Sequence, residues 1–268
     1  MSLSSHRFSR TLKNPPGEVI WAANLDVRLD LSAYAAIIQK SPDRLTIVND
    51  PTGLTRKVLK MTALNDDVYP YTPTENPRCQ VETPAFFVEG ADYWVGQSLY
   101  IPGVAEFPIP TLANPWISIG SVYGPPFAGT GPNGLSLVAV SSSNATLQWQ
   151  MNASYNWKLA WEQQIVRGAW VDIVRHINMS TDPSVGFVEQ WTNTGMGWSR
   201  NMLNGEAKTF YKTMDATNNS GPNRHALNLY YQKDAMPGAT IYTASHSIGT
   251  SFAAVAPTSY GWAPAQAP

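Results

Sequence analysis

Short runs rich in β-branched and aromatic residues, separated by frequent turn signals, constrain the fold of this chain more than any other feature. Its 268 residues include 10 Trp and 12 Tyr together with 19 Gly and 21 Pro. Aromatic and β-branched side chains favour strands, whereas glycine and proline favour turns and interrupt helices. We therefore expect an all-β fold, a two-sheet antiparallel β-sandwich of the jelly-roll, concanavalin-like type.

The expected strands lie between these turn signals. They cover residues 44–48, 57–61, 78–82, 93–100, 116–123, 135–140, 146–151, 170–179, 186–191, 226–232 and 240–244. Residues 31–40 are expected to form a short helix that ends before Pro42. Residues 156–166 fit a helix by the spacing of their apolar residues and a strand by their alternating tryptophans, and we favour the strand.

The length and the absence of internal repeats indicate a single folded domain. Residues 1–17 are expected to form an N-terminal arm, residues 18–255 the jelly-roll domain, and residues 256–268 a Pro/Ala-rich C-terminal tail. Arms of this composition are ordered mainly when a partner holds them. A multi-subunit assembly is therefore one expectation for this protein.

Composition argues against several classes of partner. The net charge is −1, so a nucleic-acid partner is not expected. No apolar run approaches the ~20 residues that span a bilayer, so no membrane insertion is expected. Cys79 is the single cysteine, which excludes an intramolecular disulfide, and it is expected to be a buried small hydrophobe.

The N-terminus lacks the apolar core of a secretory signal peptide. Two locations are consistent with this. The protein is extracellular and its signal has been removed, or it is virion-associated and leaves its cell inside a virus particle.

Two expected strands, residues 78–82 and 226–232, carry hydrogen-bonding side chains on one face. Alternate side chains of a strand share a face. This alternation selects Arg78, Gln80, Glu82, Asn228, Tyr230 and Gln232. A phenol flanked by amides suits polar, neutral or anionic ligands such as sugars. The two strands therefore predict one sheet that lines a cleft for a polysaccharide or cell-surface glycan.

The order of motifs resembles that of jelly-roll polysaccharide lyases, namely the heparin lyase I-like and glucuronan lyase-like group and, more distantly, the alginate lyases. Arg78-Cys-Gln-Val-Glu82 resembles the alginate-lyase motif Arg-Ser/Thr-Glu-Leu-Arg. Ser121-Val-Tyr123 stands where their Gln-Ile-His motif is expected. Ala226-Leu-Asn-Leu-Tyr-Tyr-Gln232 resembles Lys-Ala-Gly-Val-Tyr-Asn-Gln.

Residues 170–178 and 186–191 also resemble a strand pair of the heparin-lyase-like group, Trp-x-Asp-x-Val-x-His followed by Gly-x-Val-Glu-x-Trp. The resemblance departs from the family at four positions. Its Glu, His, Lys and Gly are replaced by Gln80, Tyr123, Ala226 and Asn228. A glutamine serves as the neutralising group in glucuronan-lyase-like enzymes, but loss of the histidine leaves a tyrosine as the base, or leaves no activity.

The resemblance implies cleavage of a uronic-acid-containing polysaccharide by β-elimination. Arg78 and Gln80 would neutralise the substrate carboxylate, and Tyr230 would be the base. A tyrosine base needs its pKa lowered from about 10, and a neighbouring arginine has that effect. Tyr123 would be a second proton carrier or a sugar platform. Side chains expected to bind substrate are Gln232, Asn228, Glu82, His176 and Trp198.

Each of these residues also has a purely structural interpretation. Arg78 pairs with Glu82 on a solvated face, Tyr230 is a tyrosine at the edge of the core, and Tyr123 caps a turn. His176 is hydrogen-bonded within its sheet instead of facing sugar. These alternatives remain open at the level of sequence.

No cofactor and no transition metal are expected, because the four histidines are scattered without ligand spacing. His225 and His246 are expected to be solvated. Calcium is a minor alternative at Asp66, Asp67 and Asp92, although neighbouring acids in loops are usually solvated.

Two rival functions accompany the lyase. A glycoside hydrolase would need two carboxylates about 5–10 Å apart, and Glu82 and Glu189 are the candidates. A non-catalytic carbohydrate-binding or structural protein of a phage virion, such as a tail component, would keep the lyase fold without its chemistry. The missing histidine and lysine favour this second rival.

Overall fold

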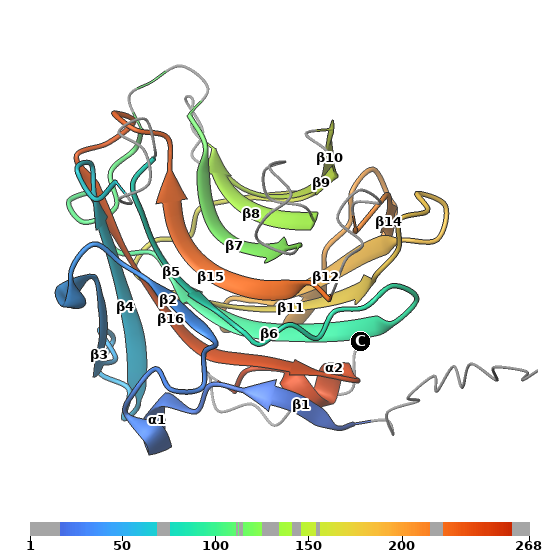
Figure 1. Ribbon diagram of the computed structural model, residues 1–268, viewed down its shortest axis with the longest axis horizontal. Coiled ribbons are helices and arrows are strands. Elements are labelled where there is room, and N and C mark those ends of the chain that lie inside the picture. The colour runs from blue at the N-terminus through green and yellow to red at the C-terminus, as the bar shows by residue number, and fades with distance from the viewer. Residues whose placement is uncertain are drawn as a thin grey trace, which may run out of the picture.

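The structure is a computed structural model that describes residues 17–68, 76–110, 112, 115–124, 134–140, 146–153, 156–214 and 222–258. Two antiparallel sheets stack on each other in it, as Figure 1 shows. The expected β-sandwich of jelly-roll type is therefore confirmed. Nearly all of the expected N-terminal arm and most of the expected C-terminal tail lie outside the described residues.

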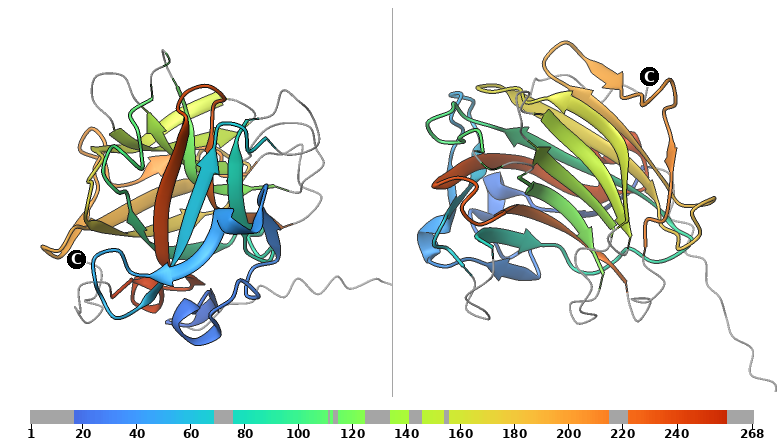
Figure 2. Two further views of the ribbon diagram at one scale, coloured as in Figure 1. Left: turned by 90° about the vertical axis from the view of Figure 1, so that its left-hand side faces the viewer. Right: turned by 90° about the horizontal axis from the view of Figure 1, so that it is seen from above.

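One sheet has seven strands, counted over the described residues. They are β2 (Ala36–Ile38), β5 (Arg78–Glu82), β7 (Ile117–Tyr123), β8 (Gly134–Val140), β9 (Thr146–Ala153), β10 (Asn156–Gln164) and β15 (Arg224–Tyr231). Their order across the sheet is β10-β9-β8-β7-β15-β5-β2. The sheet is strongly curved, and its concave face points away from the other sheet (Figures 1 and 2).

The second sheet has nine strands on the same count. They are β1 (Val19–Ala22), β3 (Leu45–Asn49), β4 (Lys57–Leu64), β6 (Asp92–Tyr100), β11 (Trp170–Asn178), β12 (Phe187–Asn193), β13 (Trp198–Arg200), β14 (Thr209–Phe210) and β16 (Gly238–Gly249). The main path is β13-β12-β11-β6-β16-β4-β3, with β1 paired to β16 and β14 to β12.

The helical elements are short: α1 (Leu25–Arg28), a 3₁₀ turn (Pro42–Arg44) and α2 (Phe252–Val255). None of the helices in the described ranges is long and apolar enough to cross a membrane. The expected helix over residues 31–40 is wrong, because Ala36–Ile38 forms β2 and pairs with β5. Pairing with β5 satisfies backbone groups that would otherwise lie unpaired at a sheet edge, and this outweighs local helix propensity. Residues 156–164 form strand β10, as favoured.

The main core lies between the two sheets. Its fully buried or nearly fully buried members include Cys79, Val81, Leu227 and Leu229 from the seven-stranded sheet and Val171, Ile173 and Ile177 from the nine-stranded sheet. Cys79 is 0% exposed, which confirms its expected burial. Because strand side chains alternate, the intervening side chains of β5 and β15 lie on the concave face.

A hydrogen-bonded polar cluster interrupts this core. Arg175 Nη2 donates to Gln97 Oε1 at 2.5 Å and lies 3.2 Å from His225 Nε2. His225 Nδ1 lies 2.9 Å from His246 Nε2, and His246 Nδ1 lies 3.3 Å from the Tyr34 hydroxyl. The two histidines are 0% and 2% exposed, so the expectation that they are solvated is wrong. Alternation along β15 turns His225 toward the core, where polar neighbours satisfy its ring.

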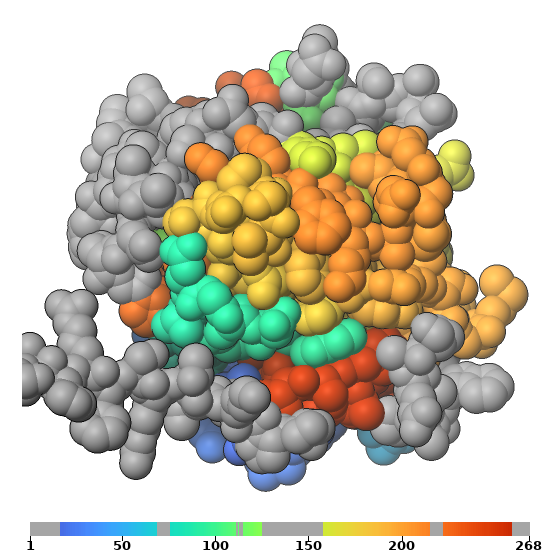
Figure 3. All heavy atoms as spheres, turned by 90° about the vertical axis from the view of Figure 1, so that its right-hand side faces the viewer, coloured from blue at the N-terminus to red at the C-terminus, as the bar shows by residue number. Residues whose placement is uncertain are grey.

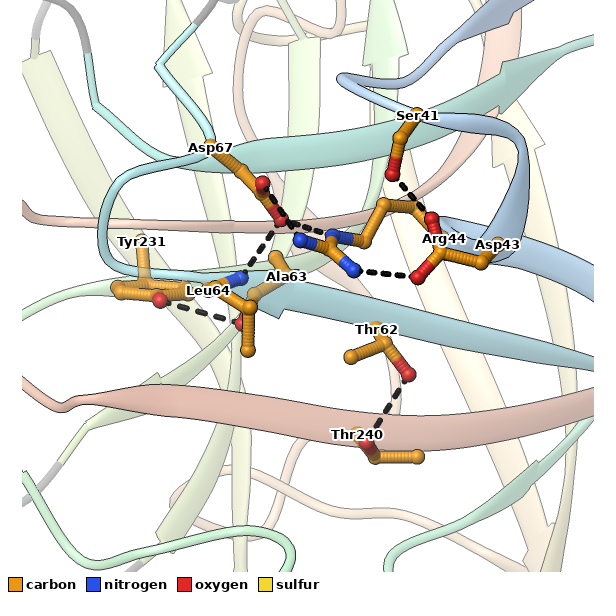
Figure 4. Close-up of polar contacts among 9 residues, drawn as sticks. All are labelled: Ser41, Asp43, Arg44, Thr62, Ala63, Leu64, Asp67, Tyr231 and Thr240. Carbon is orange, nitrogen blue, oxygen red and sulfur yellow. Dashed lines mark hydrogen bonds and ion pairs between the residues drawn. The ribbon is translucent and has the colours of Figure 1, made fainter.

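A buried ion pair fixes the segment that leads from β4 toward β5 (Figure 4). Arg44 Nε and Nη2 lie 2.5 and 3.1 Å from the two carboxylate oxygens of Asp67. Asp67 also accepts from the Leu64 backbone N–H at 2.8 Å, and its carbonyl accepts from the Arg78 N–H at 3.3 Å. Asp67 is 2% exposed, so its expected solvation is wrong. The pair therefore holds the chain just before Arg78 enters β5.

We expect Asp67→Asn to lower the free energy of unfolding by roughly 2–4 kcal/mol, because it removes the buried one of the two carboxylates that contact the largely buried Arg44 guanidinium. Asp43→Asn is the matched control. Asp43 contacts the same guanidinium at 2.7 Å but is 68% exposed, so its loss is expected to cost less than about 1 kcal/mol. Urea unfolding measures both variants, and equal losses would contradict the assignment.

The polar cluster in the core predicts sensitivity to acid. Burial lowers the pKa of His246 to about 3 and the pKa of His225 well below 6.5, and the Arg175 charge acts in the same direction. Both rings stay neutral in the folded protein at pH values where the unfolded chain takes up protons. The free energy of unfolding is expected to hold steady above about pH 7. Below about pH 6.5 it should fall by roughly 1 kcal/mol per pH unit for each ring.

Urea unfolding at pH 7, 6, 5 and 4 measures this slope. His246→Gln removes one titrating ring and is expected to give a shallower slope than the unmodified protein. Parallel slopes in the two proteins would show that His246 does not contribute.

Candidate functional site

Three neighbouring strands bring most of the predicted site residues onto the concave face. β15 lies between β5 and β7, with Tyr230 paired to Arg78 and Asn228 to Gln80. We use the name concave face for the side chains that these strands present away from the core: Arg78, Gln80, Glu82, Ser118, Ser121, Tyr123, Arg224, Asn228 and Tyr230. The strands that carry them run side by side in Figure 1.

Tyr230 is enclosed by a cation and an indole. The guanidinium carbon of Arg78 lies 4.3 Å from the centroid of the Tyr230 ring. The Trp116 ring meets it from another side, with centroids 4.7 Å apart and planes at 65°. The next residue, Tyr231, takes the core position at 0% exposure. Tyr230 is therefore a half-buried phenol on the concave face with an arginine against its ring.

Glu82 is the acidic centre of a small network beside this tyrosine. Its Oε2 lies 2.8 Å from Arg224 Nε, and its Oε1 accepts from Gln80 Nε2 at 2.5 Å. Gln80 and Glu82 are only 4% and 6% exposed. A carboxylate only accepts hydrogen bonds, so the end of the Gln80 amide that faces Glu82 is its nitrogen. The other end, Gln80 Oε1, has no hydrogen-bond partner among the described residues.

Tyr123 is held by side chains of β7 and β15. Its hydroxyl oxygen accepts from Asn228 Nδ2 at 2.9 Å. The same Nδ2 donates to Ser118 Oγ at 3.0 Å, and Ser118 Oγ lies 2.9 Å from Ser121 Oγ. Burial raises the pKa of Tyr123 to about 12, although a hydrogen bond from Ser121 and the charge of Arg78 act in the opposite direction. Tyr123 therefore carries its proton at neutral pH.

Gln232 follows the end of β15. Its backbone N–H donates to the carbonyl of Trp116 at 3.1 Å, which places it beside the indole that contacts Tyr230. It is partly exposed.

The structure does not bring His176 and Trp198 to the concave face. Both lie on the outer face of the nine-stranded sheet. His176 Nδ1 lies 2.8 Å from Glu189 Oε1 and its Nε2 3.0 Å from Asp92 Oδ1. The Trp198 ring packs edge-on against Phe252 of α2, with centroids 5.0 Å apart. Figure 3 shows this end of the molecule, with the yellow and orange residues that include β12 and β14 above the red α2.

Glu82 and Glu189, the candidate carboxylate pair of a glycoside hydrolase, also lie on different sheets. Glu82 lies on the concave face of the seven-stranded sheet, whereas Glu189 lies on the outer face of the nine-stranded sheet. Both sheets stand between them, so they do not form a carboxylate pair across one glycosidic bond.

Two of the three acidic residues considered for calcium are engaged elsewhere. Asp67 pairs with Arg44, and Asp92 accepts from Asn178 Nδ2 at 3.3 Å as well as contacting His176. Within the described ranges, no group of three or more His, Cys, Asp and Glu side chains is placed to hold a metal ion.

A pocket of about 250 Å³ lies on the other side of the molecule. It is formed by α1, the start of β4, the middle of β16 and the residues after α2, and its polar lining includes Arg56, Lys57 and Ser245. None of the predicted site residues lines it.

Sequence reasoning missed Ser118, Ser121 and Arg224. The period of two along β15 was a usable signal for Arg224, because it shares a face with Ala226, Asn228 and Tyr230. The serines were harder to place. A bulge near Gly120 shifts the register of β7, so simple alternation does not put Ser118 and Ser121 on one face.

Comparison with known proteins agrees with this fold. The family model described as polysaccharide lyase matches residues 27–223, and the match ends just before β15. No curated protein sequence matches the chain.

Solved structures of similar fold include enzymes that act on polysaccharides. The catalytic domain of a GH131 beta-glucanase from Podospora anserina has 15% sequence identity and a TM-score of 0.60, with 90% of this chain and 99% of that chain covered. The PL-14 alginate lyase from Aplysia kurodai has 10% identity and a TM-score of 0.58, with 87% and 99% covered. An alginate lyase from Chlorella virus has 9% identity and a TM-score of 0.50, with 86% and 99% covered. Likeness at these identities concerns the fold alone.

The setting of Tyr123 predicts an unusual titration. We expect its phenol to keep its proton to well above pH 11, because its pKa is raised to about 12 from the ordinary 10. Carbon-13 NMR of tyrosine labelled at Cζ measures the midpoint, and Tyr123→Phe identifies the signal. A midpoint close to pH 10 would contradict the described enclosure.

Proposed function

This chain belongs to the polysaccharide lyase family, and we propose that it cleaves a uronic-acid-containing polysaccharide by β-elimination on the concave face. The observation that carries the proposal is the contact of Arg78 with the Tyr230 ring, with 4.3 Å between the guanidinium carbon and the ring centroid. A second phenol, Tyr123, lies on β7, the strand paired with β15. An anion-binding cation and two proton carriers are the groups that this elimination needs.

Arg78 would neutralise the substrate carboxylate. The C5 proton of a uronic acid is removable only when the negative charge that builds on the carboxylate is stabilised. A guanidinium offers a planar fork of N–H groups that matches a carboxylate. Gln80 lies on the same face of β5, and its Nε2 has a second N–H besides the one given to Glu82. The two side chains would share the substrate carboxylate.

Tyr230 would be the base and Tyr123 the acid. The proton on C5 passes to the Tyr230 phenolate, and the electron pair of that bond forms the C4=C5 double bond. The C4–O4 bond breaks, its electron pair stays on O4, and O4 takes the proton of Tyr123. Tyr230 ends as a phenol and Tyr123 as a phenolate, and proton exchange with water restores both. Each transfer would contribute about 10²–10⁴ in rate.

The remaining predicted residues would bind sugar around this centre. Gln232 lies beside Trp116 next to Tyr230, and Glu82 lies beside Gln80, so hydroxyl groups of neighbouring sugars would meet an amide and a carboxylate. His176 and Trp198 would contact only a polymer that also reaches the outer face of the nine-stranded sheet. The proposed substrate is a polyuronate outside the cell, met by a secreted or virion-associated protein, and no metal is required by these steps.

A non-catalytic role is the second candidate. The positions that hold histidine and lysine in the alginate-lyase motifs hold Tyr123 and Ala226 here, which removes two groups of the family pattern. A carbohydrate-binding or structural protein of a phage virion would keep the concave face as a glycan-binding surface without turnover.

The test is the ultraviolet absorbance of unsaturated uronides, followed with glucuronan, alginate, heparan sulfate and hyaluronan, with and without calcium. We expect a rise with at least one polymer and its loss by about 10³-fold or more in Tyr230→Phe, because the base is removed. Tyr242→Phe is the matched control. Tyr242 lies in β16 of the nine-stranded sheet, where its hydroxyl donates to Glu106 Oε2 at 3.4 Å, and its variant is expected to keep full activity.

A flat trace with every polymer would contradict the lyase proposal. Retained binding to one of the same polymers would then favour the non-catalytic role. Activity that survives in Tyr230→Phe would leave the reaction class standing but remove Tyr230 as its base.

A further inference from the structure

The hydroxyl of Tyr123 is held in a way that the alginate-lyase motifs do not provide. Asn228 Nδ2 donates to its oxygen at 2.9 Å, and Ser121 is a second polar neighbour, which lowers the pKa of the phenol. Asn228 stands where those motifs have glycine, and Tyr123 stands where they have histidine. The two departures from the pattern are therefore in direct contact with each other.

Asn228, in β15, is held by contacts with both neighbouring strands, β5 and β7. It is 0% exposed, and its backbone pairs with Gln80 on β5. Its Nδ2 gives one hydrogen bond to Ser118 and one to Tyr123, which uses both N–H groups. The amide therefore has little freedom to turn toward a sugar without releasing the phenol.

The direction of these hydrogen bonds decides what Tyr123 does with its own proton. An amide nitrogen only donates, so the phenol oxygen is the acceptor from Asn228. Because this oxygen accepts from Asn228, its own hydrogen does not point at Asn228 and is free for another acceptor. Tyr123 is thus arranged as a proton donor.

The hydrogen bond from Asn228 matters most after the proton has left. Burial disfavours the phenolate of Tyr123, because water has limited access to its oxygen and stabilises the charge poorly. A hydrogen bond that already points at the oxygen strengthens as negative charge develops on it, without any rearrangement. It would therefore lower the barrier for proton transfer to O4 more than it stabilises the resting enzyme.

We propose that Asn228 is a positioning residue, which holds the Tyr123 hydroxyl as the acid of the elimination and stabilises the phenolate that forms when O4 takes its proton. This inference rests on the proposed lyase function. It adds that the asparagine acts through the tyrosine and not on the substrate.

The test is a double-mutant cycle on the lyase rate with the best polyuronate. Asn228→Ala is expected to lower kcat about 10- to 100-fold, because a hydrogen bond to a charge is lost, with KM changed less than about threefold. In a Tyr123→Phe background the same substitution is expected to cause no further loss, since the group it acts on is gone. In an Arg78→Lys background the loss should appear in full.

Two further variants sharpen the result. Asn228→Asp keeps the shape but cannot donate to the phenol, and its rate is expected to be no higher than that of Asn228→Ala. Asn178→Ala, an asparagine in a strand of the other sheet, is the matched control and is expected to keep full activity. Thermal melting of each variant confirms that the protein measured is folded.

Several outcomes would overturn the inference while leaving the lyase proposal intact. These are a loss that falls on KM alone, additive losses in the Tyr123→Phe background, or full activity of Asn228→Asp. If Tyr123→Phe has no measurable rate, the comparison of the Asp and Ala variants decides. Absence of cleavage by the unmodified protein on every polymer would remove the proposed function and this inference together.

Discussion

The register of β15 between β5 and β7 is the constraint on which the rest of the account depends. Leu227, Leu229 and Tyr231 must face the core, so the residues between them must face away from it. A slip of one residue would bury Tyr230 and turn Tyr231 outward, and every polar partner on the neighbouring strands would be lost. The apolar side of the sheet therefore positions the chemistry on its other side, and the Arg44–Asp67 pair holds the chain that delivers Arg78 to the same place.

The register of β15 also brings polar side chains of the concave face together in a hydrogen-bonded network. Asn228, Gln80 and Glu82 are almost fully buried, so each needs hydrogen-bonding neighbours in the protein. These needs are met in part by the contacts of Glu82 with Arg224 and of Asn228 with Tyr123, and the Arg78–Tyr230 contact lies beside them. Such networks fix side-chain orientation, and a fixed orientation is what proton transfer to and from a sugar ring requires.

Much of this could be predicted from the sequence, because a period of two is a local signal. The strands of β5 and β15 and the shared face of Arg78, Gln80, Tyr230 and Asn228 follow from it. What a local pattern cannot give is which of two sheets a strand joins, or which face of that sheet is covered. His176 alternates as a cleft residue would, yet it lies on the outer face of the other sheet.

Non-local pairing explains the other differences. Residues 36–38 are a strand because they pair with an edge of β5 that would otherwise be open. His225 and Asp67 have their polar partners, Arg175 and Arg44, in other segments of the chain. No single-sequence rule contains those partners. The contact between Tyr123 and Asn228 is of the same kind, since it joins residues 105 positions apart.

The central claim is that the concave face breaks a glycosidic bond by elimination and not by hydrolysis or binding alone. Mass spectrometry of a defined oligouronate after incubation with the protein tests it most directly. The account predicts two fragments whose masses add up to that of the substrate, with the double bond on the new non-reducing end. Fragments whose masses exceed that sum by one water would mean hydrolysis, and an uncut oligouronate that the protein nevertheless binds would mean that the face holds sugar without cleaving it.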